Sequence, residues 1–207
     1  RHNSTIESLN IQQKDISNEA AKAIAEELKI NLALKSLSIR WSLSNEGVKA
    51  IVEALKVNST LTSLNIANGI GEESAKAIGE ALKINSTLRT LNMALNKISV
   101  EGAKAIGEAL KINSALTSLN MSYSSISEEG AKAIGEALKT NSALTSLNMS
   151  YSSISAEGAK AIAEALKTNS ALTSLDMSRS FISEEGAKAL AEGLKMNYTL
   201  TSLAIGI

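Results

Sequence analysis

The sequence repeats itself about every 28 residues along its whole length. Each copy opens on an asparagine, and these residues are Asn3, Asn31, Asn58, Asn85, Asn113, Asn141, Asn169 and Asn197. A period of roughly 20–50 residues is typical of solenoid proteins, in which each unit packs only against its neighbours. The repeat therefore predicts a single domain over residues 1–207, with seven units of 27 or 28 residues and a partial eighth.

One copy, Asn113–Thr140, shows what each unit contains. Leu116, Leu119 and Met121 have the spacing L-x-x-L-x-L, which is typical of a short strand and the turn beside it. Across Ala131–Leu138, apolar or small residues recur at intervals of three and four, which predicts one buried face of a helix. Each unit is therefore predicted to form a strand, a loop, a helix and a turn.

The apolar residues that recur at equivalent positions of successive strands are predicted to form the hydrophobic core. Leu119 and Met121 point to the same face of their strand, and other repeats have leucine, isoleucine or methionine at these positions. A methionine column can also serve a metal or a partner groove, but Ile11, Ile39 and Ile66 share this column, so we expect it in the core. Neighbouring strands are about 4.8 Å apart whereas packed helices need about 8–10 Å, so the array must bend. The predicted fold class is α/β, a curved solenoid with a concave parallel sheet and convex helices.

The helix ends are also visible in the sequence. Ser127 precedes two glutamates, which is typical of a helix start. Asn141 follows the same helix, and we expect it to end the helix in the left-handed conformation. Four of the opening asparagines also stand in N-x-S/T sequons, namely Asn3, Asn58, Asn85 and Asn197. The structural role explains these residues without glycosylation, which is the alternative.

The run L-x-x-L-x-L-x-x-N-x-I, followed by GAKAIGEALK and an asparagine, resembles the ribonuclease-inhibitor type of leucine-rich repeat. It is most similar to the arrays of NOD-like receptors and of the GTPase-activating protein for Ran. The resemblance implies an intracellular recognition array. The asparagine of the family's turn stands at Asn96 and, in this alignment, at Asn68, whereas other repeats have Lys14, Trp41, Ser124, Ser152 and Ser180. An asparagine ladder is therefore expected to be incomplete, with serine supplying part of it.

The composition argues against several classes of function. Basic and acidic residues number 21 each, so no net charge favours nucleic acid or a membrane surface. Cysteine is absent and His2 is the one histidine, so no thiolate metal site and no histidine-based catalytic arrangement is expected. No phosphate-binding or dinucleotide-binding glycine motif occurs. The sequence therefore predicts no catalytic residue, no cofactor and no metal, and the chain is not expected to be an enzyme.

Glutamates recur once per repeat on the predicted helices, for example Glu80 and Glu108, near Lys76 and Lys104. We expect these residues to form Lys–Glu pairs four residues apart that keep the convex face soluble. No apolar run approaches the roughly 18–20 residues that a membrane span needs.

We expect the residues that bind a partner to lie at the positions where the repeats differ in sequence. The open face of the predicted sheet carries small polar residues, but aromatic residues follow several strands directly. Tyr198 is the aromatic residue that does not follow this rule. The predicted partner-binding residues of the rim and concave face are Trp41, Tyr123, Tyr151, Asp176, Arg179 and Phe181. The alternative is that these rings only shield the loop layer.

These features favour a non-catalytic module for protein–protein interaction, as a ligand-recognition or scaffold array of an intracellular receptor or effector. A cytoplasmic location follows, which includes the inside of a host cell for a secreted effector. The alternatives are a regulator, such as an activator, of a small GTPase and a purely structural spacer. The chain starts at a repeat boundary without an initiating methionine and stops within the partial eighth repeat, and we interpret it as part of a longer protein.

The two ends of the array also carry a prediction. The first and last strands expose apolar residues, Ile6, Leu9, Ile11, Leu200, Leu203 and Ile205, for which the chain supplies no cover. Such edges favour pairing with another chain, so self-association through the ends is expected.

Overall fold

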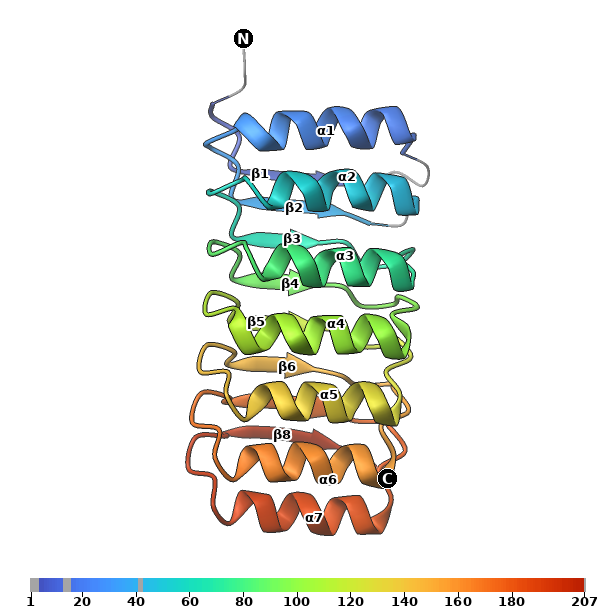
Figure 1. Cartoon of the computed structure of the whole chain (residues 1–207), viewed down its shortest axis with the longest axis vertical. Helices are drawn as coiled ribbons and strands as arrows, with labels where there is room; N and C mark the ends of the chain where they lie inside the picture. The colour runs from blue at the N-terminus through green and yellow to red at the C-terminus, as the bar shows by residue number, and fades with distance from the viewer. Residues whose placement is uncertain (1–3, 13–15, 41–42, 207) are drawn as a thin grey trace.

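The computed structural model describes residues 4–12, 16–40 and 43–206. Within these ranges, eight strands alternate with seven helices and form one parallel sheet in sequence order (Figure 1). The strands are β1 (Ser8–Ile11), β2 (Ser36–Ile39), β3 (Ser63–Asn65), β4 (Thr90–Asn92), β5 (Ser118–Asn120), β6 (Ser146–Asn148), β7 (Ser174–Met177) and β8 (Ser202–Ile205). The helices are α1 (Asn18–Ile30), α2 (Asn45–Leu55), α3 (Glu72–Leu82), α4 (Ser99–Ile112), α5 (Glu128–Leu138), α6 (Ser155–Leu166) and α7 (Glu184–Leu194).

The helices form one layer and the sheet forms the other (Figure 1). The stack of strands is shorter than the stack of helices, so that β8 lies level with the space between α5 and α6. The array therefore curves toward the sheet, as predicted. The repeats pair in register, since Leu119 is opposite Leu147 and Asn120 is opposite Asn148.

The core lies between the two layers and consists of the predicted columns. Met93, Met121, Met149 and Met177 are completely buried, and the leucine column is buried from Leu37 to Leu175. Full burial of one such side chain stabilises the fold by about 1.5–3 kcal/mol. The interpretation of the methionines as core residues is confirmed.

Glycine sets the distance between most neighbouring helices. A Cβ on Gly130 of α5 would lie 2.8 Å from the Cβ of Ala103 in α4, and Gly102 meets Ala75 in the same way. The α2–α3 junction differs, because Val48 and Ser74 stand where other repeats have alanine and glycine. These larger residues keep the two helices apart, and a hollow of about 420 Å³ opens between them on the convex surface.

The helix start predicted at Ser127 is confirmed, but the helix end predicted at Asn141 is wrong. Ser127 Oγ accepts a hydrogen bond from Gly130 N at 3.4 Å, as expected of a cap. Asn141 does not take up the left-handed conformation, because helix α5 ends at Leu138 and the asparagine side chain bridges to the preceding repeat instead. Its Nδ2 donates to the carbonyl oxygen of Leu110 at 2.7 Å.

The same bridge explains the sequons. Asn58 and Asn85 are buried, and the side-chain nitrogen of each donates to carbonyl groups of the preceding repeat, at 2.7 Å for Asn58 and Leu28. A glycan on this nitrogen would remove these bonds, so both asparagines are structural. Asn197 makes equivalent bonds, and Asn3 lies outside the described residues.

The ladder of side chains that link neighbouring turns contains both asparagine and serine, as predicted, but the predicted place of Asn68 in it is wrong. Asn96 Oδ1 accepts from Ile70 N at 2.9 Å, and the Ser124 hydroxyl donates to the Met93 carbonyl at 3.1 Å. Asn68 is not part of this ladder, since the third repeat is one residue shorter and Gly69 takes the position. Ser180 acts like Ser124, whereas the buried Ser152 hydroxyl has no partner among the described residues. Lys14 and Trp41 lie outside the described residues.

The ion pairs of the convex face also differ from the prediction. Lys76 pairs with Glu72 at 2.6 Å and with Glu73 at 3.1 Å, whereas Glu80 pairs with Lys83. A glutamate that precedes its lysine in a helix is the better order, since it also suits the helix dipole. These pairs are exposed and contribute little to stability.

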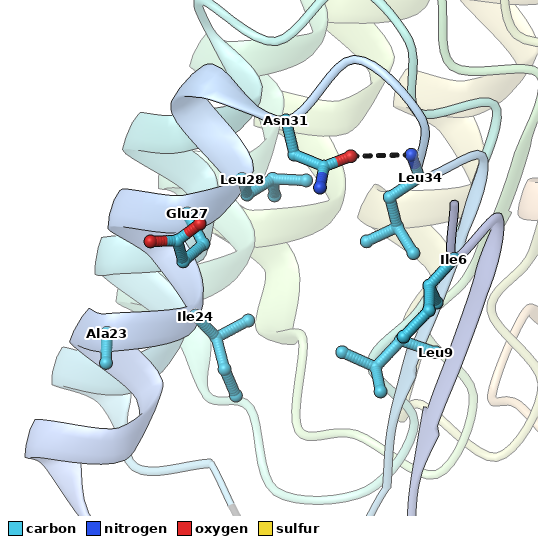
Figure 2. A pocket seen from close by; sticks show the side chains of 8 residues that line it. All are labelled: Ile6, Leu9, Ala23, Ile24, Glu27, Leu28, Asn31 and Leu34. Atoms are coloured by element: carbon cyan, nitrogen blue, oxygen red, sulfur yellow. Dashed lines mark hydrogen bonds between the residues drawn. The ribbon is translucent and has the colours of Figure 1, made fainter. Parts of the chain in front are cut away.

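Apolar side chains are exposed at both ends of the described array, as expected. Ile6 is exposed, and with Leu9, Ile24, Leu28 and Leu34 it lines a hollow between β1 and α1 (Figure 2). At the other end, Ile205 of β8 is exposed as well. Self-association through these ends stays a prediction. Among the described ranges, every helix is too short or too polar to cross a lipid bilayer.

Candidate protein-binding site

A row of side chains projects from the edge where the strands lead into the loops. It consists of Leu95, Tyr123, Tyr151 and Arg179, each two positions after a core methionine, and we call it the loop-edge row. All four residues have a left-handed backbone, with φ between 53° and 61°. This conformation costs a non-glycine residue about 1–2 kcal/mol. Main-chain hydrogen bonds between neighbouring loops offset this conformational cost. Tyr123 N donates to Ser150 O and Tyr151 N donates to Ser178 O, both at 2.9 Å.

The two tyrosines of the row stack on each other. Their ring centroids are 3.8 Å apart with 15° between the planes. The guanidinium of Arg179 continues the stack, with its Cζ 5.5 Å from the centroid of the Tyr151 ring. A cation over an aromatic face contributes about 0.5–1 kcal/mol at an exposed site. The three side chains thus form one ordered unit contributed by three consecutive repeats.

The predicted exposure of these residues is confirmed. Tyr123 is 47% exposed, Tyr151 40% and Phe181 79%, and Arg179 is exposed too. If these rings only shielded the main chain of the loops, we would expect them to be buried. An ordered stack that remains open to solvent is available for contact with another molecule.

The stack also changes the acidity of one ring. A hydrogen bond with the Tyr151 hydroxyl raises the pKa of Tyr123 above its usual range, and partial desolvation and the neighbouring phenol act in the same direction. The positive charge of Arg179 acts weakly against this shift in the pKa. Tyr123 therefore stays a neutral hydrogen-bonding phenol at physiological pH.

The structure brings only some of the predicted residues together. Tyr123, Tyr151 and Arg179 form the stack, and Phe181 follows Arg179 by two positions in the same loop with φ 53°. Trp41 lies outside the described residues. Tyr198 is 93% exposed but starts the last repeat, away from the row in sequence position.

Asp176 has a local structural contact instead of a place in the row. It lies in β7, and its Oδ1 accepts from Ser178 N at 2.9 Å and from Ser178 Oγ at 2.7 Å. Asn148 makes the same two bonds with Ser150 in the preceding repeat. Asp176 therefore shapes the turn that leads into the loop with Arg179.

Sequence reasoning missed Leu95, the fourth member of the row. It is 45% exposed and borders a hollow of about 360 Å³ together with Asn68, Gly69 and Lys97. The available signal was the column two positions after the core methionine, which contains Leu95 beside Tyr123 and Tyr151. An exposed leucine in the aromatic column extends the apolar part of the row by one repeat.

The row contains no arrangement for covalent catalysis or metal binding. Phenol, guanidinium and aliphatic groups offer stacking, hydrogen bonds and charge, which suits recognition. No group of three histidine, cysteine or acidic side chains that could hold a metal occurs in residues 4–12, 16–40 and 43–206.

Comparisons with known proteins agree with the fold. The family model described as Leucine Rich repeat matches five segments, residues 2–25, 85–107, 113–135, 140–163 and 168–191. A comparison with curated proteins finds no match.

Two solved structures of other proteins are similar to this chain. The leiomodin-1 structure described as actin-binding site 2 has a TM-score of 0.56 and 27% identity, over 62% of this chain and 77% of that chain. The tropomodulin C-terminal domain of Caenorhabditis elegans has a TM-score of 0.51 and covers 88% of this chain and 94% of that one. Its identity is 17%, so this likeness concerns the fold alone.

Proposed function

Because the chain belongs to the leucine-rich repeat family, we propose that it is a protein-binding module without catalytic activity of its own, which holds its partner at the loop-edge row. The observation that carries this proposal is the exposed stack of Tyr123, Tyr151 and Arg179. Tyrosine and arginine are enriched among the residues that dominate binding energy at protein interfaces. The open face of strands β3 to β6 carries only serine, threonine and asparagine, which are poor anchors, so we place the centre of the interface at this stack.

The order of the stack supports the same function. Ordering a mobile side chain at an interface costs about 0.5–1.5 kcal/mol in conformational entropy. A side chain that is already held in one arrangement avoids most of this cost. The left-handed backbone and the loop-to-loop bonds of Tyr123 and Tyr151 provide this order before a partner arrives. A partner of standard size would bury roughly 800 Å² on each side, which exceeds the row and would include part of the concave sheet.

Affinity capture from a lysate tests the proposal. The intact chain, a Tyr123/Tyr151/Phe181→Ala variant and a Tyr198→Ala variant would be immobilised in equal amounts. Tyr198 is the matched control, since it is an exposed ring outside the row. We expect the intact chain and the control to retain the same partner, and the triple variant to retain at least tenfold less. Equal retention by all three would contradict binding through the row.

Binding of actin is a second candidate function. The observation that favours it is the 27% identity with the leiomodin-1 region described as an actin-binding site. Co-sedimentation with filamentous actin and a fluorescence titration with labelled monomeric actin would test it. Binding in either assay that the triple variant loses would identify actin as the partner at the row. No binding in both assays would rule out actin and leave the general proposal unaffected.

A further inference from the structure

Arg179 differs from most cations of the array in its surroundings. It forms no ion pair with a carboxylate among the described residues, and its guanidinium lies over Tyr151 instead. The lysines of the neighbouring helices are already paired, since Lys160 contacts Glu157 and Glu185. The positive charge of Arg179 is therefore available on the outer side of the stack.

The acidic groups nearest in sequence to Arg179 are engaged elsewhere. Asp176 accepts two hydrogen bonds from Ser178, and Glu184 pairs with Lys188 at 2.7 Å. A carboxylate that is already bonded has little to gain from moving to the guanidinium. Within the part of the chain that the structure describes, Arg179 thus has no carboxylate partner, because the nearby acids are already bonded to other groups.

The charged side chains of the four loops that carry the row have one sign. The loop segments 94–98, 122–127, 150–154 and 178–183 contain no aspartate or glutamate, and their charged residues are Lys97 and Arg179. Lys97 is exposed and forms no ion pair within the described part of the chain. The first and last of these four loops therefore each carry a cation, Lys97 beside Leu95 and Arg179 beside Tyr151.

We infer that the loop-edge row binds an acidic segment of a partner protein, in which an apolar side chain lies beside one or more carboxylates. The inference rests on the proposed function and names the chemistry of the partner. Arg179 would bind a carboxylate through two parallel N–H donors, a geometry that a planar guanidinium provides. The Tyr151 ring lies beside that guanidinium, and the exposed parts of the Tyr123 and Leu95 side chains would receive the apolar side chain. Lys97 would attract a second carboxylate.

A protein segment suits the row better than a nucleic acid. The tyrosine rings stack on each other at 3.8 Å, so no base can enter between them. The chain has no net charge, and the helix starts beside the loops carry glutamates such as Glu128 and Glu157. These glutamates are already paired with Lys132 and Lys160. A phosphate backbone carries a charge on every nucleotide and would meet only two cations in these four loops, whereas one or two carboxylates of a protein segment need no more than Arg179 and Lys97.

Selection from a random peptide library displayed on phage tests the inference. The 207-residue chain, its Arg179→Gln variant and its Lys188→Gln variant would be immobilised in parallel. Lys188 is the matched control, because it is an exposed cation on a helix outside the row. We expect the peptides selected on the intact chain and on the control to contain aspartate and glutamate at least threefold more often than the library. We expect this enrichment to be absent on R179Q.

The strongest selected peptide and its Asn/Gln counterpart would then be measured by fluorescence polarisation, together with a labelled twelve-residue poly-uridine. The reference is the affinity of the acidic peptide for the intact chain. We expect the Asn/Gln peptide to bind the intact chain at least tenfold more weakly than this, and the acidic peptide to bind R179Q at least tenfold more weakly. We expect the oligonucleotide not to bind. Circular dichroism and thermal unfolding would establish that R179Q is folded.

The opposite outcomes are distinct. Selection without an acidic preference, recovery no higher than the background, or equal binding to R179Q would overturn the inference, as would tight oligonucleotide binding that R179Q loses. If R179Q keeps the partner captured from a lysate while the tyrosine variant loses it, the proposed function stands and the acidic partner is wrong.

Discussion

Asn113 at the end of α4 donates a hydrogen bond from Nδ2 to the carbonyl oxygen of Leu82, the last residue of α3, over 2.7 Å. The last carbonyl groups of a helix have no partner within the helix, and here the next repeat supplies one. The opening asparagines from Asn58 to Asn197 repeat this contact, as with Asn141 and Leu110 or Asn169 and Leu138. The residue that marks each copy in the sequence therefore joins neighbouring copies in space.

The first prediction is that Asn113→Ala destabilises the array by about 2–4 kcal/mol. The substitution removes bonds to the carbonyls of Leu82 and Asn85 and from the amides of Ala115 and Leu116, and leaves these buried groups without partners. Urea unfolding followed by circular dichroism measures the change. Asn197→Ala is the control, where the same bonds are only half-buried and the loss is expected to be smaller. A loss below about 0.5 kcal/mol for Asn113→Ala would refute the buried bridge.

The second prediction concerns the close approach of helices. Gly102→Ala would place a Cβ 2.8 Å from the Cβ of Ala75 and 3.0 Å from Cγ2 of Ile98. We expect a destabilisation of about 1–3 kcal/mol despite the gain of about 1 kcal/mol in helix propensity. The control is Ala191→Gly, an exposed helical position, which should cost only the propensity difference. A stabilised Gly102→Ala variant would show that the helices can separate at no cost.

The fold was predictable because its determinants recur. The spacing of Leu119 and Met121 identifies a strand in one repeat, and the same columns in the other repeats identify the sheet. Asn141 was assigned wrongly because one repeat alone suggests a left-handed cap. The actual partner, the carbonyl of Leu110, lies 31 residues away and is visible only in the stacked array. Asn68 was misplaced because the third repeat is one residue shorter.

The candidate site was predictable in composition but not in geometry. The sequence placed Tyr123 and Tyr151 in equivalent loops, and the structure confirms that both are exposed. Their stacking depends on the distance between neighbouring loops, which follows from main-chain bonds such as Tyr123 N to Ser150 O. Asp176 looked like a site residue because it breaks a column of asparagines. Its carboxylate makes the same turn contacts as the amide of Asn148, which a change of charge in the sequence does not reveal.

The third prediction concerns the loose α2–α3 junction. Val48→Ala and Ser74→Gly together recreate the alanine and glycine that other helix pairs use, and should let the two helices close over the hollow between them. Each single change is expected to destabilise, since Val48→Ala leaves a cavity and Ser74→Gly removes a bond to Asn45 Oδ1 of 3.0 Å. The double variant should lose less than the sum of the two, by at least about 0.5 kcal/mol. Urea unfolding of all four proteins measures this coupling, and strict additivity would mean that the helices do not move together.

The fourth prediction is a titration of the stack. Because the bond with Tyr151 raises the pKa of Tyr123 above its ordinary 10.0, one of the three tyrosines should ionise at a higher pH than free tyrosine. Absorbance at 295 nm during a pH titration measures this. Tyr151→Phe should lower the pKa of Tyr123 toward its usual value, because the bonding hydroxyl, the largest cause of the shift, is removed. The sign for stability follows from the raised pKa. The neutral phenol is favoured in the folded state, so its contribution is fully present below pH 10 and is lost as the pH rises through the raised value. If Tyr123 in the intact chain titrates like free tyrosine, the two hydroxyls do not bond and the stack is held by ring contact and Arg179 alone.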